Sequence, residues 1–197
     1  MGLTAIFGGT FNPFHIGHYE MLSALQNDNS VDKIFVLPDS IPPHKRCEFL
    51  ADDNIRIEMC NIVAEDFSKA EVCLIEFERE GKSYTYDTVL MLKDKYPNDN
   101  FCFVCGGDML VYFPNWYKAK ELMELLPFIV FKRADTNDKE FNNSVLSLTE
   151  QGMKITVKDE IITSVSSTSI RKDFKNSRKF LPQKVYGFLL ERGQYIE

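Results

Sequence analysis

Two histidines three residues apart, His15 and His18, follow a pair of glycines in the segment Gly8-Gly9-Thr10-Phe11-Asn12-Pro13-Phe14-His15-Ile16-Gly17-His18. The glycines let backbone N–H groups approach a bulky anion, and a helix that begins near His15 adds partial positive charge at its N-terminus. Two imidazoles on one helical face can both donate to one phosphate group. A lone histidine is more often a satisfied polar residue beside the core, but this pair behind glycines indicates a phosphate site. The spacing matches neither a Walker loop nor a dinucleotide fingerprint.

A second candidate phosphate site is Ser166-Ser167-Thr168-Ser169-Ile170-Arg171, near the other end of the chain. Hydroxyls at the start of a helix are ordinary capping residues. Arg171, one turn into the helix, changes this interpretation because a guanidinium beside exposed amides and hydroxyls binds phosphate well. Two such cradles suit a triphosphate.

Three further segments carry weaker signals. Pro42-Pro43-His44-Lys45-Arg46 places cations on a stiff loop, where Lys45 or Arg46 could close onto phosphates, although a solvated charge run explains it equally well. Trp116, the only tryptophan, follows a proline turn in a loop and fits either a ligand pocket or loop packing. The segment Ser83 to Thr88 is by itself an ordinary helix start.

The elements that must position these residues alternate between short apolar runs and amphipathic stretches. This pattern predicts an α/β fold with a doubly wound, mostly parallel sheet, helices on both faces, and one domain over residues 1–197. Its ligands should lie at the carboxyl ends of the strands, near the switch point. We expect strands at residues 3–7, 33–37, 72–77, 101–105, 128–131, 154–157 and 160–165, and helices at 15–26, 53–64, 85–96, 119–125, 167–174 and 182–192.

Three local details complete the predicted fold. Gly8 to Thr10 is expected to form a tight turn, and residues 134–152 a surface loop containing one short helix. Asp52 or Asp53 is expected to cap the helix that runs to Ala64.

Composition excludes several classes of protein. The 197 residues are 44% apolar, enough for a full core, and the net charge of −6 gives no global attraction for nucleic acid. The sequence shows neither an apolar run long enough to cross a membrane nor a leader segment, so we expect a cytoplasmic location. Cys102 and Cys105 are three apart on a strand and face opposite sides, so we expect buried thiols and no metal held by the protein.

The ordered set GGTFNPFHIGH, PPHK, SYTYDT, GGD, W-Y and SSTSIR, which spans nearly the whole chain, resembles the bacterial nicotinate-nucleotide adenylyltransferases of the HxGH nucleotidyltransferase superfamily. The resemblance implies a Rossmann-like nucleotidyltransferase fold. It also implies transfer of AMP from ATP to nicotinate mononucleotide, which gives deamido-NAD and pyrophosphate, with Mg²⁺ assisting. Asn12 departs from the aspartate of many members, and its amide can still orient the loop.

The resemblance implies a role for each matching residue. The catalytic group would be His15, His18, Lys45 and Arg171. ATP would contact Gly8, Gly9, Thr10, Phe11, His15, His18, Gly106, Asp108, Ser167, Thr168 and Arg171. Nicotinate mononucleotide would contact Thr85, Trp116, Tyr117, His44 and Lys45.

Rival functions share part of this pattern. A related adenylyl- or cytidylyltransferase would use the same chemistry on another phosphorylated acceptor, such as nicotinamide mononucleotide or phosphopantetheine. A non-catalytic nucleotide sensor would bind ATP without releasing pyrophosphate, and the intact His15, His18 and Arg171 argue against it. The sequence leaves open whether the chain forms a homo-oligomer.

Overall fold

The computed structural model describes residues 2–41 and 49–195. The strands are β1 (Leu3–Gly9), β2 (Val31–Pro38), β3 (Ala70–Val72), β4 (Asn100–Gly106), β5 (Phe128–Arg133) and β6 (Ile155–Ile162). The α-helices are α1 (Ile16–Asn27), α2 (Asp53–Ala64), α3 (Thr85–Lys95), α4 (Gly107–Tyr112), α5 (Ala119–Leu125), α6 (Asp138–Glu150), α7 (Ser167–Lys172) and α8 (Gln183–Glu191). Short 3₁₀ helices lie at Ile75–Glu78, Phe113–Asn115 and Arg178–Phe180.

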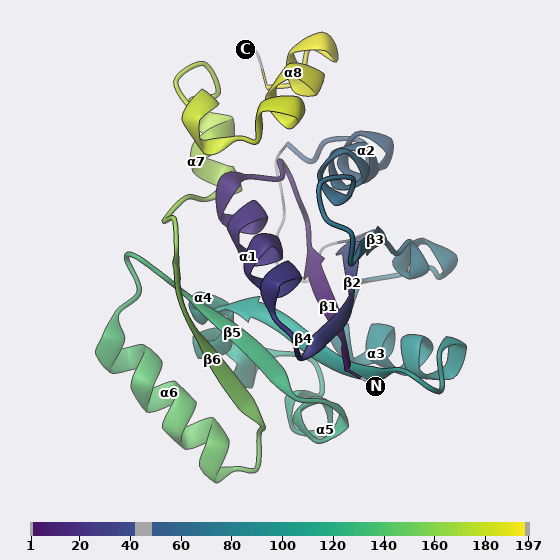
Figure 1. Ribbon diagram of the computed structural model, residues 1–197, viewed down its shortest axis with the longest axis vertical. Coiled ribbons are helices and arrows are strands. Elements are labelled where there is room, and N and C mark those ends of the chain that lie inside the picture. The colour runs from purple at the N-terminus through teal and green to yellow at the C-terminus, as the bar shows by residue number, and fades with distance from the viewer. Residues whose placement is uncertain (1, 42–48, 196–197) are drawn as a thin grey trace.

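Within these described ranges, the strands form one six-stranded sheet in the order β3-β2-β1-β4-β5-β6 (Figure 1). Every neighbouring pair is parallel. The chain builds outward from β1 to one edge and then from β4 to the other, so the order reverses between these two strands. The predicted doubly wound sheet is therefore confirmed, with its switch point between β1 and β4.

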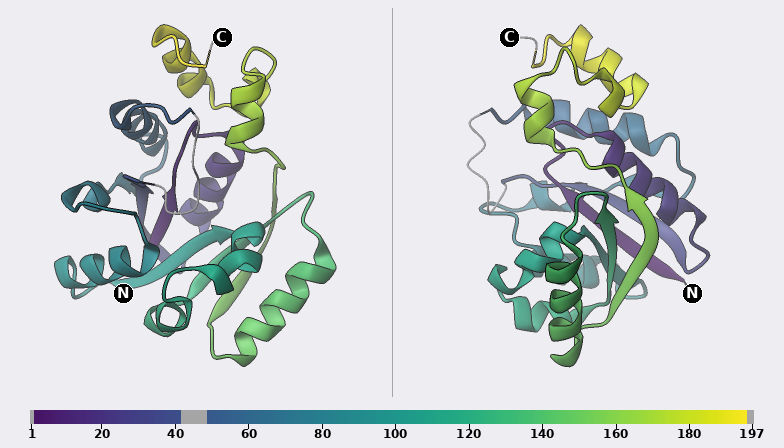
Figure 2. Two further views of the ribbon diagram at one scale, coloured as in Figure 1. Left: turned by 180° about the vertical axis from the view of Figure 1, so that it is seen from behind. Right: turned by 90° about the vertical axis from the view of Figure 1, so that its left-hand side faces the viewer.

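Alternating residues along the strands pack into two cores, one on each face of the sheet. Ala5 and Phe7 lie in a cluster with side chains of α1, α2, α7 and α8. Ile6 lies in a second cluster with side chains of α3, α4, α5 and α6. Helices α7 and α8 lie together at the end of the molecule opposite the N-terminus (Figure 2). Both faces of the sheet are covered, as a parallel sheet requires.

The central strand β4 shows the same alternation with its two cysteines. Cys102 belongs to the first cluster and Cys105 to the second, so the prediction that they face opposite sides is confirmed. Burial raises the pKa of the Cys102 thiol to about 12, and it raises the pKa of Cys105 further. These thiols are therefore packing residues and stay protonated at neutral pH.

Three sequence expectations on the strands are wrong in detail. Gly8 and Gly9 continue β1, where they pair with Leu37 and Pro38 of β2, so the turn comes after them. The strand expected at 72–77 ends at Val72, and the chain then forms the 3₁₀ helix Ile75–Glu78, which buries Glu76. The two strands expected at 154–157 and 160–165 are one strand, β6, with a register shift where it pairs with β5.

The expected loop at 134–152 is mostly helix α6, thirteen residues long. Its side chains Phe141, Val145 and Leu148 are spaced as one helical stripe and pack into the second cluster. Asn137 caps the helix by accepting from the backbone of Glu140. The stripe is narrow because the other positions are polar. With so few apolar residues, the helical period is weak in the sequence, and the helix is not predicted from it.

Helix α2 begins at Asp53 as expected, but its capping bond is absent: neither the Asp52 side chain nor another side chain caps it within the described residues. None of the helices in those ranges is long and apolar enough to cross a membrane.

Candidate nucleotide-binding site

A cavity of about 320 Å³ opens at the carboxyl ends of β1 and β4. It lies at the switch point of the sheet, where doubly wound folds bind their ligands. Most of the residues singled out in the sequence line it together. They are Gly8, Gly9, Thr10, Phe11, His15, His18, Thr85, Gly106, Asp108, Trp116, Ser167, Thr168 and Arg171.

The two histidines begin helix α1 and cap it with each other. His15 is the N-cap residue, and its Nδ1 accepts from the backbone N–H of His18 at 3.3 Å. Nδ1 of His18 accepts in turn from the backbone N–H of His15 at 3.2 Å. Because each Nδ1 is an acceptor, the neutral rings carry their proton on Nε2. Nε2–H is then the donor that each ring can present to an anion.

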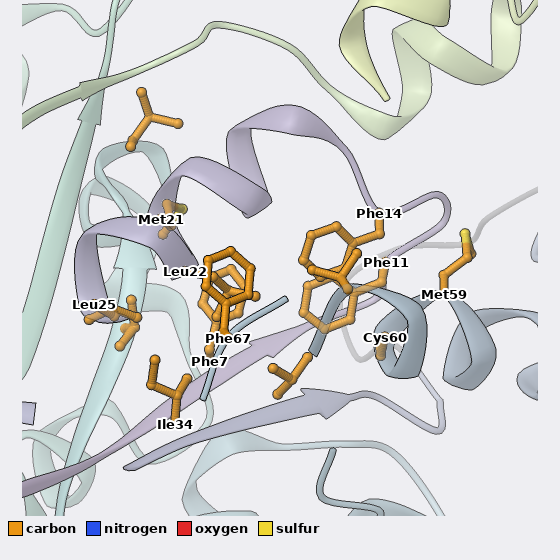
Figure 3. Close-up of a cluster of buried hydrophobic side chains, with 14 of the residues drawn as sticks. Phe7, Phe11, Phe14, Met21, Leu22, Leu25, Ile34, Met59, Cys60 and Phe67 are labelled. Carbon is orange, nitrogen blue, oxygen red and sulfur yellow. The ribbon is translucent and has the colours of Figure 1, made fainter. Parts of the chain in front are cut away.

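The rings of His15 and His18 are stacked, with centroids 3.6 Å apart and planes 13° apart. Phe11 and Phe14 each meet the His18 ring edge-on, with centroids 5.1 Å away. Phe11 and Phe14 themselves stack at 4.9 Å, and Figure 3 shows them between α1 and the side chains Met59 and Cys60 of α2. The apolar core therefore holds the His18 ring in one orientation.

Phe11 also shows how the loop is built. The whole residue is 1% exposed, and its backbone has a φ of +46°, a conformation that residues other than glycine adopt only where the surrounding packing determines it. The core therefore fixes the loop at Phe11.

Gly17, between the two histidines, lies where the backbone of Thr163 and the His15 ring come too close for a side chain. A Cβ at this position would lie 3.1 Å from the carbonyl oxygen of Thr163 and 3.3 Å from the ring of His15. Glycine therefore lets α1 pack against the segment that follows β6. This segment leads directly into α7, so the packing brings the second predicted cradle to the first.

Helix α7 is bound to the loop before α1 by two hydrogen bonds. Ser167 Oγ donates to the carbonyl of Pro13 at 2.9 Å, and Arg171 Nη1 donates to the carbonyl of Asn12 at 2.6 Å. Arg171 Nη2 also donates to Thr168 Oγ1 at 3.3 Å. We call this side of the cavity the histidine wall, and it comprises residues 10–15, His18 and residues 166–171.

The histidine wall has an anchor that the sequence analysis missed. Arg56 of α2 is fully buried, and its Nη1 donates to the backbone carbonyls of Thr10 and Asp39. Nη1 also meets the carboxylate of Asp39 at 3.1 Å, and Nη2 meets that of Asp53 at 2.5 Å. The available signal was a cation within the apolar stripe of a helix, at a position that faces the core.

At the end of β4, Gly106 and Asp108 line the cavity as expected. Arg133, which ends β5, lines it too, and its Nη1 lies 3.9 Å from Asp108 Oδ2. This distance is too long for a hydrogen bond, so the two groups form a loose ion pair at the rim.

The opposite side of the cavity, which we call the tryptophan wall, comprises Glu76, residues 83–88 and Trp116. Thr88 Oγ1 donates to Glu76 Oε1 at 2.5 Å. Within the described residues, Glu76 Oε2 and Trp116 Nε1 are buried and have no hydrogen-bond partner. Buried polar atoms of this kind are rare, and a ligand or an ordered water is the usual partner. Glu76 itself was missed by the sequence analysis because the segment around it was read as a strand.

Three expected site residues stand apart from this lining. Tyr117 is 43% exposed and lies outside the cavity lining, where its ring contacts that of Tyr84 in a tilted arrangement with centroids 4.6 Å apart. His44 and Lys45 lie outside the described residues, so their predicted role stays a prediction. Among the residues that the structure does describe, no cluster of three His, Cys, Asp or Glu side chains could hold a metal ion.

Comparison with known proteins identifies relatives of the whole chain. A family model described as cytidylyltransferase-like matches residues 6–173. The chain is similar to nicotinate-nucleotide adenylyltransferase of Bacillus subtilis (strain 168), with 38% identity and 96% of each chain covered. It is also 37% identical to a probable nicotinate-nucleotide adenylyltransferase of Fusobacterium nucleatum, with 98% of each covered.

A solved structure has the same fold. Plasmodium falciparum nicotinic acid mononucleotide adenylyltransferase, complexed with NaAD, superimposes with a TM-score of 0.80 over 99% of this chain and 98% of that one. The two sequences are 22% identical, so this likeness concerns the fold.

Proposed function

We propose that this chain, which belongs to the cytidylyltransferase-like family and within it to the nicotinate-nucleotide adenylyltransferases, transfers AMP from ATP to nicotinate mononucleotide. The products are nicotinate adenine dinucleotide, or deamido-NAD, and pyrophosphate. The reaction is a step of NAD biosynthesis.

One observation carries this proposal: a single cavity collects both predicted phosphate cradles and the tryptophan. His15 and His18 come from the first tenth of the chain, Arg171 from its end, and Trp116 from the middle. A site with phosphate donors on one wall and a partly apolar wall opposite suits a reaction between a triphosphate and an aromatic mononucleotide.

The chemistry needs positioning and electrostatics. An oxygen of the mononucleotide's 5′-phosphate attacks the α-phosphorus of ATP, and the bond from that phosphorus to the oxygen bridging to the β-phosphate breaks. This phosphate is already ionised at neutral pH, so no general base is required. The protein's task is to hold two anions in line and to aim donors at the charge that develops on the phosphoryl oxygens.

The histidine wall supplies these donors. In this proposal, Nε2–H of His15 and His18 binds the phosphates undergoing transfer, while Gly8, Gly9, Thr10 and Phe11 face the phosphates and ribose of ATP. Ser167, Thr168 and Arg171 hold the distal phosphates. The support is the shared lining and the hydrogen bonds that tie the two segments together.

The remaining roles follow the same proposal. Gly106 and Asp108 lie near the nucleotide ribose. Thr85 and Trp116 hold the pyridine ring, with Tyr117 at the edge of that pocket, and His44 and Lys45 approach the phosphates of the mononucleotide. The unpartnered Trp116 Nε1 supports a ligand at this wall.

The proposal extends to the metal ion, the domain and the cellular compartment. Mg²⁺ enters with ATP as part of the substrate and shields its phosphate charges. Residues 1–197 act as one nucleotidyltransferase domain, because both ends of the chain contribute to one cavity. The cytosol is the site of action, where the described cysteines, all free thiols, stay reduced.

The test is a direct assay of purified protein with ATP, Mg²⁺ and either nicotinate or nicotinamide mononucleotide, following pyrophosphate and dinucleotide together. We expect both products with the nicotinate substrate and at least tenfold lower kcat/KM with the nicotinamide one, because a site built for a carboxylate leaves donors unpaired on an amide. Replacing ATP by CTP should abolish turnover. Pyrophosphate release with phosphopantetheine and not with a pyridine mononucleotide would contradict the proposal.

A further inference from the structure

The end of the chain reaches into the loop that carries the histidines. Tyr195 donates its hydroxyl hydrogen to Oδ1 of Asn12, a residue 183 positions earlier. Its ring packs against Phe174, with centroids 5.9 Å apart, in the core that α7 and α8 share with α1. The contact therefore joins the C-terminal segment to the histidine wall.

Asn12 is the point where four segments of the protein meet. Its side chain is 1% exposed, its Nδ2 donates to the carbonyl of Phe49 at 2.8 Å, and its Oδ1 also accepts from the backbone N–H of Ala51 at 3.2 Å. Its own carbonyl accepts from Arg171. An amide oxygen has two lone pairs, and here Ala51 and Tyr195 use both. The residue lies three positions before His15, so its placement sets that of the histidine pair.

The conformation of the C-terminal segment indicates that contacts hold it in place. Tyr195 has a φ of +59°, and Gly193, two residues before it, a φ of +64°. A tyrosine adopts this left-handed conformation at a cost, and the conformation persists only where surrounding interactions determine it. The Phe174 ring and the Asn12 amide are among the contacts that do so here.

We propose that Tyr195 is a positioning residue, which holds residues 10–15 in the geometry that presents His15 and His18 to the transferred phosphates. It acts through Asn12 and touches no substrate itself. The proposal rests on the proposed function for the reaction that it affects. Misplacing a catalytic group by a fraction of an ångström slows turnover, so the effect should appear in kcat.

The first test is Tyr195→Phe, which removes one oxygen and keeps the packing on Phe174. We expect kcat to fall about five- to tenfold, the size of one lost hydrogen bond, while KM for both substrates stays within about twofold. Tyr186→Phe is the matched control, because Tyr186 also packs on Phe174, with centroids 5.5 Å apart. It should change kcat by less than about 1.5-fold.

The second test asks whether the effect passes through Asn12. In an Asn12→Ala background the acceptor is gone, so adding Tyr195→Phe should cause no further loss of kcat. Equal losses in both backgrounds would show that Tyr195 acts only through general packing and would overturn the proposal.

The third test needs no substrate. Amide hydrogen exchange in residues 10–15 should become severalfold faster in Tyr195→Phe and stay unchanged in Tyr186→Phe. Unchanged exchange in both variants overturns the positioning role, whatever the activity assay shows. An inactive parental chain would refute the proposed function alone, since the exchange experiment still decides the role of Tyr195.

Discussion

The two walls of the cavity differ in how complete they are before any ligand arrives. On the histidine wall, the polar groups already bind one another: His15 and His18 cap each other, and Arg171 and Ser167 donate to the loop carbonyls. On the tryptophan wall, Glu76 Oε2 and Trp116 Nε1 have no hydrogen-bond partner within the described chain, and the nearest cation to Glu76 Oε2 is Arg79 Nη2 at 3.9 Å.

This difference separates two tasks. Donors that are fixed in advance stabilise a transition state without reorganising, so the histidine wall should govern turnover. Polar atoms that lack partners gain them only when the correct ligand binds, so the tryptophan wall should govern affinity and choice of acceptor. If the proposed function is correct, we expect one wall to serve catalysis and the other recognition of the acceptor.

The largest effect is expected at the histidine wall. His18→Ala should lower kcat about 10²–10³-fold, because it removes one preorganised donor to the transferred phosphate. The melting temperature should fall by only a few degrees, since His18 is half-buried and its loss removes one capping bond of α1. Steady-state kinetics and a thermal melt measure the two quantities. A kcat within about threefold of the parental value would contradict the assignment of turnover to the histidine wall.

Two arginines, the buried Arg56 and the partly exposed Arg79, test how each wall is held. Arg56→Met should lower the free energy of unfolding by about 3 kcal/mol, because it leaves the Asp39 carboxylate without its buried partner. Arg79→Met, on the tryptophan side, is the comparison variant: Arg79 is partly exposed, its Nη1 donates to the carbonyl of Lys82 at 2.7 Å, and its Nη2 lies 3.9 Å from Glu76 Oε2 in a loose ion pair, so the loss should be about 1 kcal/mol. Urea denaturation compares them, and equal losses would remove the contrast.

A smaller effect is expected at Trp116. Trp116→Leu should raise KM for the mononucleotide about tenfold, the contribution of one stacked aromatic ring, and leave kcat and KM for ATP within about threefold. The KM of Trp116→Phe for the mononucleotide should lie between those of the parental protein and Trp116→Leu, because phenylalanine keeps a ring but lacks the indole N–H. If Trp116→Leu lowered kcat and left KM unchanged, the division of tasks between the walls would be wrong.

The smallest effect is expected outside the cavity, where the pH dependence of stability at Asp28 serves as a reference. Burial alone would raise the pKa of Asp28, but hydrogen bonds from Lys158 and Ser30 outweigh it and lower the pKa from 3.8 to about 2. The stabilisation is therefore complete above pH 3.8 and is lost as the pH falls through 2, with a size on the order of 1 kcal/mol.

Urea denaturation between pH 2 and 5 measures this loss, and Lys158→Met should reduce it by removing the cation at 2.8 Å. A pH slope that survives in Lys158→Met at full size would assign the effect to other carboxylates.

Sequence reading located the residues of the histidine wall because their signals are local. Glycines before two histidines, and hydroxyls before Arg171, each lie within one short segment. Residues of the tryptophan wall were harder to find, because the buried Glu76 accepts a hydrogen bond from Thr88, twelve positions away in the sequence. Helix α6 was missed because its apolar stripe is sparse, and the break after β3 because four consecutive apolar residues also fit a strand.

The sequence by itself determined the parallel sheet, the two segments proposed to bind phosphate and the kind of reaction, since each follows from residue types within a few positions of one another. Only the tertiary structure decided that Arg56 anchors the loop, that Gly17 admits the segment before α7, and that Tyr195 reaches Asn12. These contacts join residues between 46 and 183 positions apart. The physical reason is that such pairs are selected by the packing of the whole sheet, which no local pattern encodes.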